Sequence, residues 1–293
     1  MEPQHKTPSR WTIKDVLEWT AAYFKKRGIT TARLDAEVLL AFCLSADRLF
    51  LYLNLERPLL TAERVRYREL VRRRAMREPV SLIIGKKEFW SLPFRVVPGV
   101  LIPRPDTEIL VEAVVQEIRS IPEPRVLEIG TGSGAVSVAI AKENPTAEIL
   151  ATDVNLLALE TASLNAEECG VSGSIDFLCT DLFLAISQRE LFDVICSNPP
   201  YIPHDTIPTL DPEINFEPIL ALDGGPDGLD VIRHIAVHAR HFLKDRGALI
   251  LEMDPEQENQ ARRIFTNLTG LAEIRVFPDL SGKARVIKGK LFK

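Results

Sequence analysis

Residues 198–201 read Asn-Pro-Pro-Tyr and directly follow an apolar run at 192–197. Two consecutive prolines fix two φ angles and disfavour helical backbone at the residue before them, so a stiff turn is expected after a buried strand. Such a turn presents the Asn198 side-chain oxygen and the Pro199 carbonyl as two fixed acceptors, which suit the two N–H donors of a planar –NH2 group. The alternative is an ordinary strand-ending turn, because Asn-Pro is common in turns.

A glycine-rich segment at 130–134 follows another apolar run at 125–129. Glycines between a strand and a helix let the backbone approach a ligand closely, although the spacing is not that of the dinucleotide fingerprint. Asp153 comes about 20 residues later at the end of the next predicted strand, where a carboxylate can accept hydrogen bonds from ribose hydroxyls. Asp181 follows the third predicted strand, where it would hold an adenine amino group or cap a helix.

These motifs must be positioned by a sheet, because apolar strand-like segments alternate with helical ones from residue 125 onward. The candidate strands are 125–129, 147–152, 174–178, 192–197, 246–252, 272–277 and 284–288. Repeated strand–helix units predict an α/β fold with a mainly parallel, doubly wound sheet. Ligands of such sheets bind at the carboxyl ends of the strands, which is where each motif above falls.

Residues 11–85 show helical periodicity and no strand signal. Thr12 and Asp15 predict a capping box at the start of a helix that Gly28 ends. Two further helices are expected near 34–43 and 49–53, and Thr61 is expected to cap a fourth that is rich in arginine.

Residues 86–104 change to aromatic and β-branched residues punctuated by proline, which predicts a β-hairpin. We therefore expect a helical substrate-recognition domain at 1–85, a β-hairpin linker at 86–104 and a catalytic domain at 105–293.

The charge is unevenly distributed along the 293 residues. The chain has a net charge of −5, with +6 in residues 1–125 and −11 in the remainder. Most of the excess basic charge comes from the arginines of one segment: Arg64, Arg66, Arg68, Arg72, Arg73, Arg74 and Arg77. This segment is either a surface for an acidic protein or nucleic acid, or a solvated helix face interleaved with glutamates.

No stretch approaches the roughly 18 apolar residues of a membrane span, and no secretory signal is visible. The four cysteines show no paired spacing and are interpreted as small buried hydrophobic residues, which indicates a reducing, cytoplasmic location without disulfides.

His234, His238 and His241 have a spacing that could bind a metal, but no acidic or cysteine partner is apparent nearby. A plain helix face without a metal is therefore expected.

The glycine loop, the Asp153 strand end and the Asn-Pro-Pro-Tyr turn together resemble class I S-adenosylmethionine-dependent methyltransferases. The Pro-Arg-Pro-Asp-Thr-Glu element at 103–108, the helical N-terminal region and Phe216-Glu217-Pro218 narrow the resemblance to the HemK family. These enzymes methylate the side-chain nitrogen (N5) of the glutamine in the Gly-Gly-Gln motif of class 1 peptide chain release factors. The resemblance covers nearly the whole chain. It implies a Rossmann-like, seven-stranded domain, S-adenosylmethionine as cofactor, S-adenosylhomocysteine as product and a release factor as partner, without direct contact with nucleic acid or membrane.

The same resemblance implies a role for each matching residue. The cofactor would contact Gly130, Thr131, Gly132, Ser133, Gly134, Asp153, Asp181, Leu182 and Asn198. The substrate glutamine would contact Asn198, Pro199, Pro200 and Tyr201, and the catalytic residues among these would be Asn198, Pro199 and Tyr201. Some relatives carry Trp at the position of Leu182, and the segment 251–255 also departs from the family pattern, since relatives usually have glycine near Asp254.

Three other functions remain open at this level. An adenine-N6 nucleic-acid methyltransferase shares the Asn-Pro-Pro-Tyr chemistry, but the chain has no large target-recognition domain and carries net negative charge. A ribosomal-protein glutamine methyltransferase and a non-catalytic cofactor-binding protein are the other two. Arg104 and Asp106 are expected either to orient the cofactor loop or to brace the helix that follows, and the glycine-rich loop 223–228 is expected near the mouth of the pocket.

Overall fold

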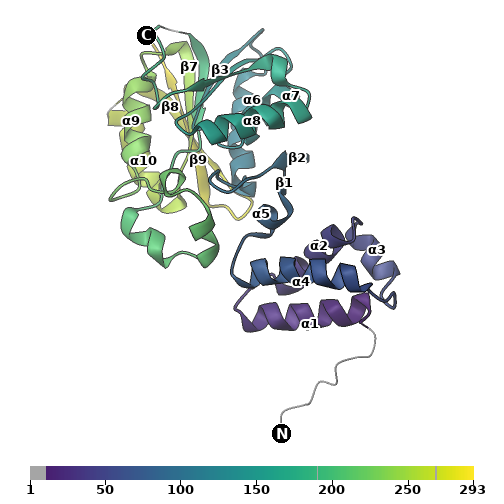
Figure 1. Ribbon diagram of the computed structural model, residues 1–293. Helices are drawn as coiled ribbons and strands as arrows, with labels where there is room; N and C mark the ends of the chain where they lie inside the picture. The colour runs from purple at the N-terminus through teal and green to yellow at the C-terminus, as the bar shows by residue number, and fades with distance from the viewer. Residues whose placement is uncertain (1–10, 190, 268) are drawn as a thin grey trace. The chain divides into compact units, whose positions relative to one another are not determined.

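The computed structural model describes residues 11–189, 191–267 and 269–293. The chain forms two compact units, one extending to Gly85 and the other spanning Lys86–Lys293 (Figure 1). Each unit has its own hydrophobic core. The first ten residues, which the sequence assigns to the helical domain, lie outside the described residues.

The first unit is helical, as predicted. Its helices are α1 (Ile13–Lys26), α2 (Ala32–Cys43), α3 (Arg48–Leu53), α4 (Thr61–Ala75) and α5 (Val80–Ile84). The predicted capping box is present, since the Asp15 N–H donates to Thr12 Oγ1 at 3.2 Å and the Thr12 N–H donates to Asp15 Oδ2 at 2.9 Å. Both bonds satisfy donors that the first turn of a helix leaves without partners.

The predicted cap of the fourth helix is wrong. Thr61 is the first helical residue, and the N-cap position belongs to Leu60, whose side chain has no acceptor. The Glu63 carboxylate takes over instead by accepting a hydrogen bond from the Leu60 N–H at 2.8 Å. A carboxylate in the first turn also interacts favourably with the positive end of the helix dipole.

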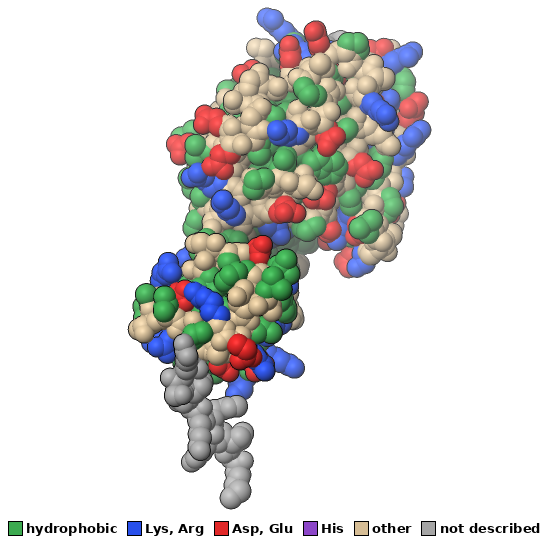
Figure 2. All heavy atoms as spheres, turned by 90° about the vertical axis from the view of Figure 1, so that its right-hand side faces the viewer, with side chains coloured by type: hydrophobic (Ala, Val, Ile, Leu, Met, Phe, Trp, Pro, Cys, Tyr) green, Lys and Arg blue, Asp and Glu red, His purple; other side chains and the backbone are tan. Residues whose placement is uncertain are grey.

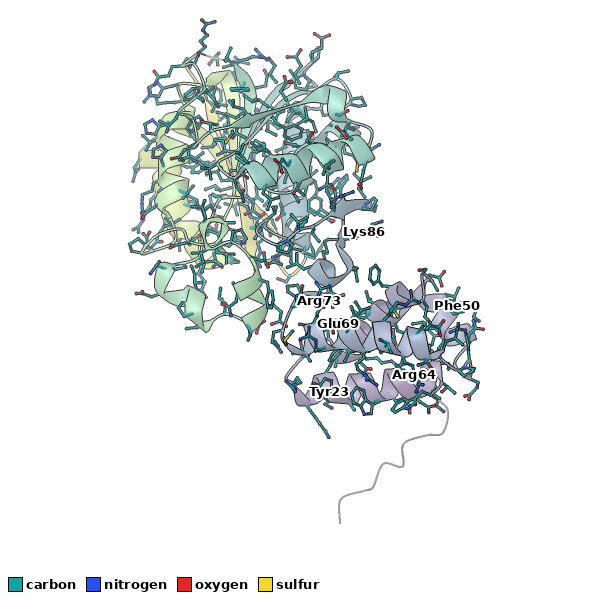
Figure 3. All side chains as sticks on the ribbon, in the orientation of Figure 1. Tyr23, Phe50, Arg64, Glu69, Arg73 and Lys86 are labelled. Atoms are coloured by element: carbon teal, nitrogen blue, oxygen red, sulfur yellow. The ribbon has the colours of Figure 1, made fainter. Side chains whose placement is uncertain are left out.

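The arginine-rich helix α4 uses several of its side chains inside the unit (Figure 3). Arg72 pairs with Glu69 at 2.6 Å, Arg73 pairs with Glu78, and the buried Arg74 pairs with Asp35 at 2.7 Å. These ion pairs interrupt the basic face and favour the structural interpretation of the segment over a continuous phosphate-binding surface.

The larger unit begins with an antiparallel hairpin of β1 (Lys86–Phe89) and β2 (Leu92–Arg95). Its two turn residues have positive φ angles, as a two-residue hairpin turn requires. The paired region is shorter than the predicted 86–104. The strands end at Arg95, and the following segment contains Pro98, which has no N–H to donate to a ladder.

The main sheet has seven strands in the order β5-β4-β3-β6-β7-β9-β8. They are β3 (Arg125–Ile129), β4 (Glu148–Asp153), β5 (Ile175–Cys179), β6 (Phe192–Ser197), β7 (Leu243–Glu252), β8 (Leu271–Pro278) and β9 (Ala284–Leu291). The first five are parallel, and β9 pairs antiparallel with both β7 and β8. The predicted seven-stranded, mainly parallel sheet is confirmed. The largest boundary differences are the start of β7 and the end of β9.

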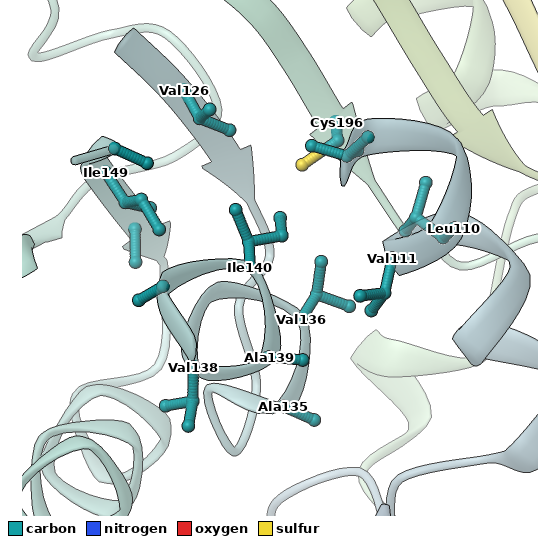
Figure 4. Packing of buried hydrophobic residues seen from close by; sticks show 14 of the residues in the cluster. Leu110, Val111, Val126, Ala135, Val136, Val138, Ala139, Ile140, Ile149 and Cys196 are labelled. Atoms are coloured by element: carbon teal, nitrogen blue, oxygen red, sulfur yellow. The ribbon is translucent and has the colours of Figure 1, made fainter. Parts of the chain in front are cut away.

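Helices cover both faces of this sheet (Figure 1). One face carries α6 (Glu108–Ile118), α7 (Ala135–Glu143) and α8 (Leu156–Glu168), and the other carries α9 (Asp230–Ala239) and α10 (Glu258–Asn267). Successive strand residues point to opposite faces, so Val194 and Cys196 join the first core and Ile195 joins the second. Figure 4 shows the first core, where α6 and α7 pack side chains against β3 and β6.

Short 3-10 turns connect several of these elements. They are η1 (Pro105–Thr107), η2 (Ser172–Ser174), η3 (His204–Thr209), η4 (Pro212–Phe216), η5 (Ile219–Ala221) and η6 (Pro255–Gln257).

The cysteines are free, and three of them are buried. Cys179 is exposed, contrary to the sequence prediction, because it ends β5 at the edge of the sheet.

Among the described residues, no group of three or more His, Cys, Asp or Glu side chains is arranged to hold a metal ion. None of the helices in the described part of the chain is both long and apolar enough to cross a membrane.

Candidate active site

A cavity of about 230 Å³ opens at the carboxyl ends of β3, β4 and β6. The strand order reverses here, because β4 and β5 lie on one side of β3 and β6 and β7 lie on the other. Such a switch point is the usual ligand site of doubly wound folds. The sequence-predicted residues that line it are Gly130, Thr131, Gly132, Ser133, Asp153, Asp181, Leu182, Asn198, Pro199 and Pro200. Gly134 and Tyr201 do not line the cavity.

The glycines of the 130–134 loop have two different tasks. A methyl group added at Gly130 or Gly132 would meet no atom within 4 Å, so both positions leave open space beside the backbone. A methyl group at Gly134 would lie 2.9 Å from Ala162 Cβ on α8, so this glycine permits close packing of two helices. The first two therefore shape the cavity, and the third supports it from behind.

Asp153 connects the glycine loop to the end of β4. Its Oδ2 accepts the Gly132 N–H at 2.9 Å, and its Oδ1 accepts the Asn155 N–H at 2.9 Å. Each carboxylate oxygen has a second lone pair, so the half-buried side chain can still accept hydrogen bonds from a ligand.

Asp181 and Leu182 lie where β5 ends and also line the cavity. Asp181 does not act as the helix cap that the sequence offered as an alternative. The nearby backbone N–H of Ala185 donates to the Thr180 hydroxyl instead. Leu182 has a φ angle of +48°, a conformation that L-residues with side chains rarely adopt. Such local strain is typical of functional sites, and here it occurs at a cavity-lining residue.

A buried carboxyl group, Glu128, lies at the end of β3. Its Oε2 accepts hydrogen bonds from Thr131 Oγ1 at 2.7 Å and from the Ser137 N–H at 3.1 Å, and also from the Ser137 hydroxyl. Burial raises the pKa of Glu128 to about 7, although these hydrogen bonds oppose the shift. The carboxyl group ties the glycine loop to the first turn of α7.

The two acceptors predicted at the Asn-Pro turn are open. Asn198 Nδ2 donates to Thr107 Oγ1 at 3.0 Å, which turns Oδ1 away from that hydrogen bond. No described group donates a hydrogen bond to Asn198 Oδ1 or to the Pro199 carbonyl. Since both residues line the cavity, the arrangement offers two acceptors to a ligand with two N–H donors.

The glycine-rich loop 223–228 holds this turn in place. The Ile202 N–H donates to the Leu222 carbonyl and the Gly224 N–H donates to the Ile202 carbonyl, each at 2.9 Å. A methyl group at Gly224 would lie 2.7 Å from the Pro200 carbonyl oxygen, and one at Gly228 would overlap the Tyr201 carbonyl oxygen. These glycines therefore let two backbones run in direct contact.

Tyr201 faces the end of β7. Its hydroxyl donates to Glu252 Oε1 at 3.1 Å, and its carbonyl accepts from Gln257 Nε2 at 2.9 Å. The segment 251–255, which departs from the expected pattern, continues into η6, where the Asp254 side chain accepts the Glu256 N–H at 2.8 Å. This turn places Gln257 beside Tyr201.

The segment after the hairpin forms one wall of the cavity and is therefore more than a linker. Gly99, Val100, Leu101, Pro103, Arg104 and Thr107 all line the cavity. Arg104 Nη2 lies 2.5 Å from Oε1 of the buried Glu217, which joins this wall to the loop after the Asn-Pro-Pro-Tyr turn. Asp106 does not line the cavity and instead pairs with Arg285 of β9 at 2.9 Å.

Comparisons with known proteins identify the family of this chain. The PrmC N-terminal domain matches residues 15–85, and the methyltransferase small domain matches residues 105–209. A release factor glutamine methyltransferase from Rhodopirellula baltica is 41% identical over 293 residues, which cover 98% of each chain. The chain belongs to the release factor glutamine methyltransferase family.

A second relative agrees with this membership, and a solved structure shares the fold. A release factor glutamine methyltransferase from Geobacter sulfurreducens is 40% identical over 97% of this chain and 98% of its own. A methyltransferase from Pyrococcus furiosus has a similar fold, with a TM-score of 0.51 and 18% identity over 71% of this chain and 92% of its own.

Several residues of this methyltransferase site escaped the sequence analysis. Asn165 of α8 is buried and donates through Nδ2 to the Ser133 carbonyl at 2.8 Å and to the Arg95 carbonyl at 3.1 Å. Thr107, Glu252 and Gln257 likewise support the Asn-Pro-Pro-Tyr turn from distant parts of the chain. The sequence signal for Glu252 was a lone acidic residue at the end of an apolar strand, the same signal that singled out Asp153.

Proposed function

We propose that this protein transfers a methyl group from S-adenosylmethionine to the side-chain amide nitrogen of the glutamine in the Gly-Gly-Gln motif of class 1 release factors, in the cytoplasm. Membership of the release factor glutamine methyltransferase family supports this function. The structural observation that carries it is the pair of open acceptors at Asn198 and Pro199, two residues that line the cavity together with the glycine loop.

The cavity fits an adenosine-based cofactor by the chemistry of its donor and acceptor groups. The open space at Gly130 and Gly132 accommodates a ligand against the backbone. Asp153 offers acceptors for ribose hydroxyls, while Asp181 and Leu182 offer an acceptor and an apolar surface for the adenine. S-adenosylmethionine, when bound, supplies an electrophilic methyl group on a sulfonium.

The chain's own contribution to the reaction is positioning. An amide nitrogen is a poor nucleophile because its lone pair is delocalised into the carbonyl group. Asn198 Oδ1 and the Pro199 carbonyl would grip both N–H bonds of the glutamine, orient its nitrogen and favour developing sp³ character. Correct orientation alone can contribute several kcal/mol or more to the barrier reduction.

No strong base is needed before transfer, because attack by the neutral amide nitrogen would leave a cationic N-protonated amide, which is strongly acidic and loses its proton readily to water. Tyr201, which the sequence predicts to pack against the amide plane, does not line the cavity and would support the Pro-Pro turn from behind. Its hydroxyl is already engaged with Glu252, and burial raises its pKa, so it stays protonated and serves as a packing group.

The helical unit would recognise the release factor away from the Gly-Gly-Gln tip, since one glutamine side chain offers too little contact area for specificity. Large apolar side chains are exposed on this unit, including Trp19 at 51%, Leu53 at 75% and Leu60 at 65%. Figure 2 shows hydrophobic side chains among charged ones on one face of it. These side chains would supply the apolar contacts of a protein-binding surface.

The test is methyl transfer from labelled S-adenosylmethionine to three acceptors: a class 1 release factor, the same factor with its Gly-Gly-Gln glutamine replaced by alanine, and duplex DNA. Label on the first acceptor alone is expected. Label on DNA would favour the adenine reaction, and label on none would favour another protein substrate or a binding role.

The same assay tests the proposed grip on the amide. Asn198→Ala should abolish turnover while cofactor affinity falls only in part, whereas Asn144→Ala, at the end of α7, should leave both unchanged. Unchanged turnover in Asn198→Ala would refute the proposed mechanism.

A further inference from the structure

Glu252 is a fully buried acidic residue that the mechanism above does not use. It is the last residue of β7, and its side chain is 0% exposed. The preceding residue, Leu251, pairs with Ser197 of β6, so the carboxyl group lies directly beside the start of the Asn-Pro-Pro-Tyr turn. A buried carboxyl group costs free energy unless its oxygens have partners, and this cost calls for an explanation.

Only one of the two carboxyl oxygens has a hydrogen-bond partner among the described residues. Oε1 accepts from the Tyr201 hydroxyl at 3.1 Å, whereas Oε2 has none. The Thr107 hydroxyl faces the same carboxyl group closely enough to lower its pKa. Oε2 is therefore an unpartnered acceptor in a buried carboxyl group that lies near the Thr107 hydroxyl.

Thr107 links this carboxyl group to the catalytic turn, because its Oγ1 accepts from Asn198 Nδ2 at 3.0 Å. A hydroxyl can donate or accept, so Thr107 alone does not decide which end of the Asn198 amide turns toward it. An ionised carboxylate only accepts. If Thr107 donates to Glu252, its oxygen must accept from the amide nitrogen, and Asn198 Oδ1 is left for the substrate.

We propose that Glu252 is a positioning residue for methyl transfer, which sets the direction of the hydrogen-bond chain through Thr107 and thereby fixes the orientation of the Asn198 amide. The inference rests on the proposed function, since it assigns the amide orientation that the glutamine nitrogen requires. Glu252 touches neither the cavity nor the reacting atoms and acts only through its neighbours.

The charged and titratable groups around Glu252 make the hydrogen-bond chain from Glu252 through Thr107 to Asn198 sensitive to pH. Burial, with a smaller contribution from Asp106 of η1, raises the pKa of Glu252 to about 7, although the Thr107 hydroxyl, the Tyr201 phenol and Arg285 of β9 act to lower it. Below that pH the carboxyl group carries a proton that it can donate to Thr107. The Thr107 proton is then no longer held by an acceptor-only carboxylate and can turn toward either end of the Asn198 amide. Because the amide orientation is no longer fixed, turnover should fall as the pH drops through about 7.

The decisive variant is Glu252→Gln, which keeps the shape but introduces a donor into an acceptor-only site. Its turnover on the release factor should fall by about tenfold to a hundredfold, the usual range for a misplaced reacting group. Its affinity for S-adenosylhomocysteine, measured by calorimetry, and its unfolding midpoint below pH 7 should stay at the wild-type values. Glu256→Gln, the same change on the adjacent exposed turn, is the matched control.

Two variants of Thr107 separate positioning from folding. Thr107→Val removes the hydroxyl at nearly constant volume and should lose as much turnover as Glu252→Gln, while Thr107→Ser should retain it. The double variant Glu252→Gln/Thr107→Val should lose no more than either single variant, because both interrupt one chain. The acid limb of the turnover profile near pH 7 should disappear in Glu252→Gln.

The outcomes distinguish this inference from the proposed function. A wild-type protein that labels no release factor would refute the function. A wild-type protein that does so while Glu252→Gln matches its turnover and pH profile would overturn the positioning role alone. Equal losses in Thr107→Ser and Thr107→Val, or additive losses in the double variant, would overturn it too, and these tests remain available if Glu252→Gln does not fold.

Discussion

Two single substitutions, Gly134→Ala and Gly132→Ala, should have different effects on stability and on cofactor binding, because one glycine packs against a helix and the other faces the cavity. Both residues have positive φ angles, +79° and +56°, so each alanine costs about 1–2 kcal/mol of backbone strain. Alanine also restricts the unfolded chain, which returns about 0.4–1 kcal/mol. The two positions differ in what the new methyl group meets, since Gly134 faces Ala162 at 2.9 Å and Gly132 faces open space.

The crowding at Gly134 involves the Ala162 backbone as well, with its Cα at 3.0 Å, so no side-chain rotation relieves it. Overpacking of this kind adds about 1–3 kcal/mol. Gly134→Ala should therefore lower the free energy of unfolding by about 2–4 kcal/mol, and Gly132→Ala by about 1 kcal/mol.

The assay is urea unfolding followed by circular dichroism, with the denaturant slope checked to be unchanged. Calorimetric binding of S-adenosylhomocysteine should show the opposite order, because the Gly132 methyl group would project into the cavity. A Gly134→Ala variant as stable as Gly132→Ala would show that the assignment of the two glycines is wrong.

Three further predictions follow from buried charges and from the unit boundary. The pKa of Glu128 is raised from 4.5 to about 7, so its contribution favours the folded state at low pH and is lost as the pH rises through about 7. Relative to Glu128→Gln, the wild type should therefore lose roughly 3 kcal/mol of unfolding free energy between about pH 4 and about pH 8. A difference in unfolding free energy between the two proteins that does not change with pH would contradict the raised pKa. Asp35→Ala should destabilise the helical unit by about 3 kcal/mol in thermal unfolding, because it leaves the Arg74 guanidinium buried without its carboxylate; a change as small as that of an exposed pair such as Arg72–Glu69 would be unexpected. Deleting residues 1–85 should raise KM for the full-length release factor far more than it lowers cofactor affinity, and unchanged activity would refute a recognition role for that unit.

Local sequence signals predicted most of the fold. The strands were visible because each is a short apolar run bounded by turn residues, and the capping box at Thr12 and Asp15 depends only on residues three positions apart. The prediction failed where a neighbour competed for the same role, as when Glu63 rather than Thr61 completed the start of α4. It also missed that Cys179 is exposed, because nothing local says which strand lies at the edge of a sheet.

The sequence by itself determined the residue types of the site and their positions at strand ends: the glycine loop, Asp153 and Asn198. These signals are contiguous in the chain and depend on backbone constraints that proline and glycine impose locally. Only the tertiary structure decided what holds them. Thr107 lies 91 positions before Asn198, Glu252 lies 51 positions after Tyr201, and Asn165 reaches back 32 positions to Ser133. Contacts across such separations depend on how the sheet orders its strands and on which loops meet above it, and no short pattern of residues encodes that order.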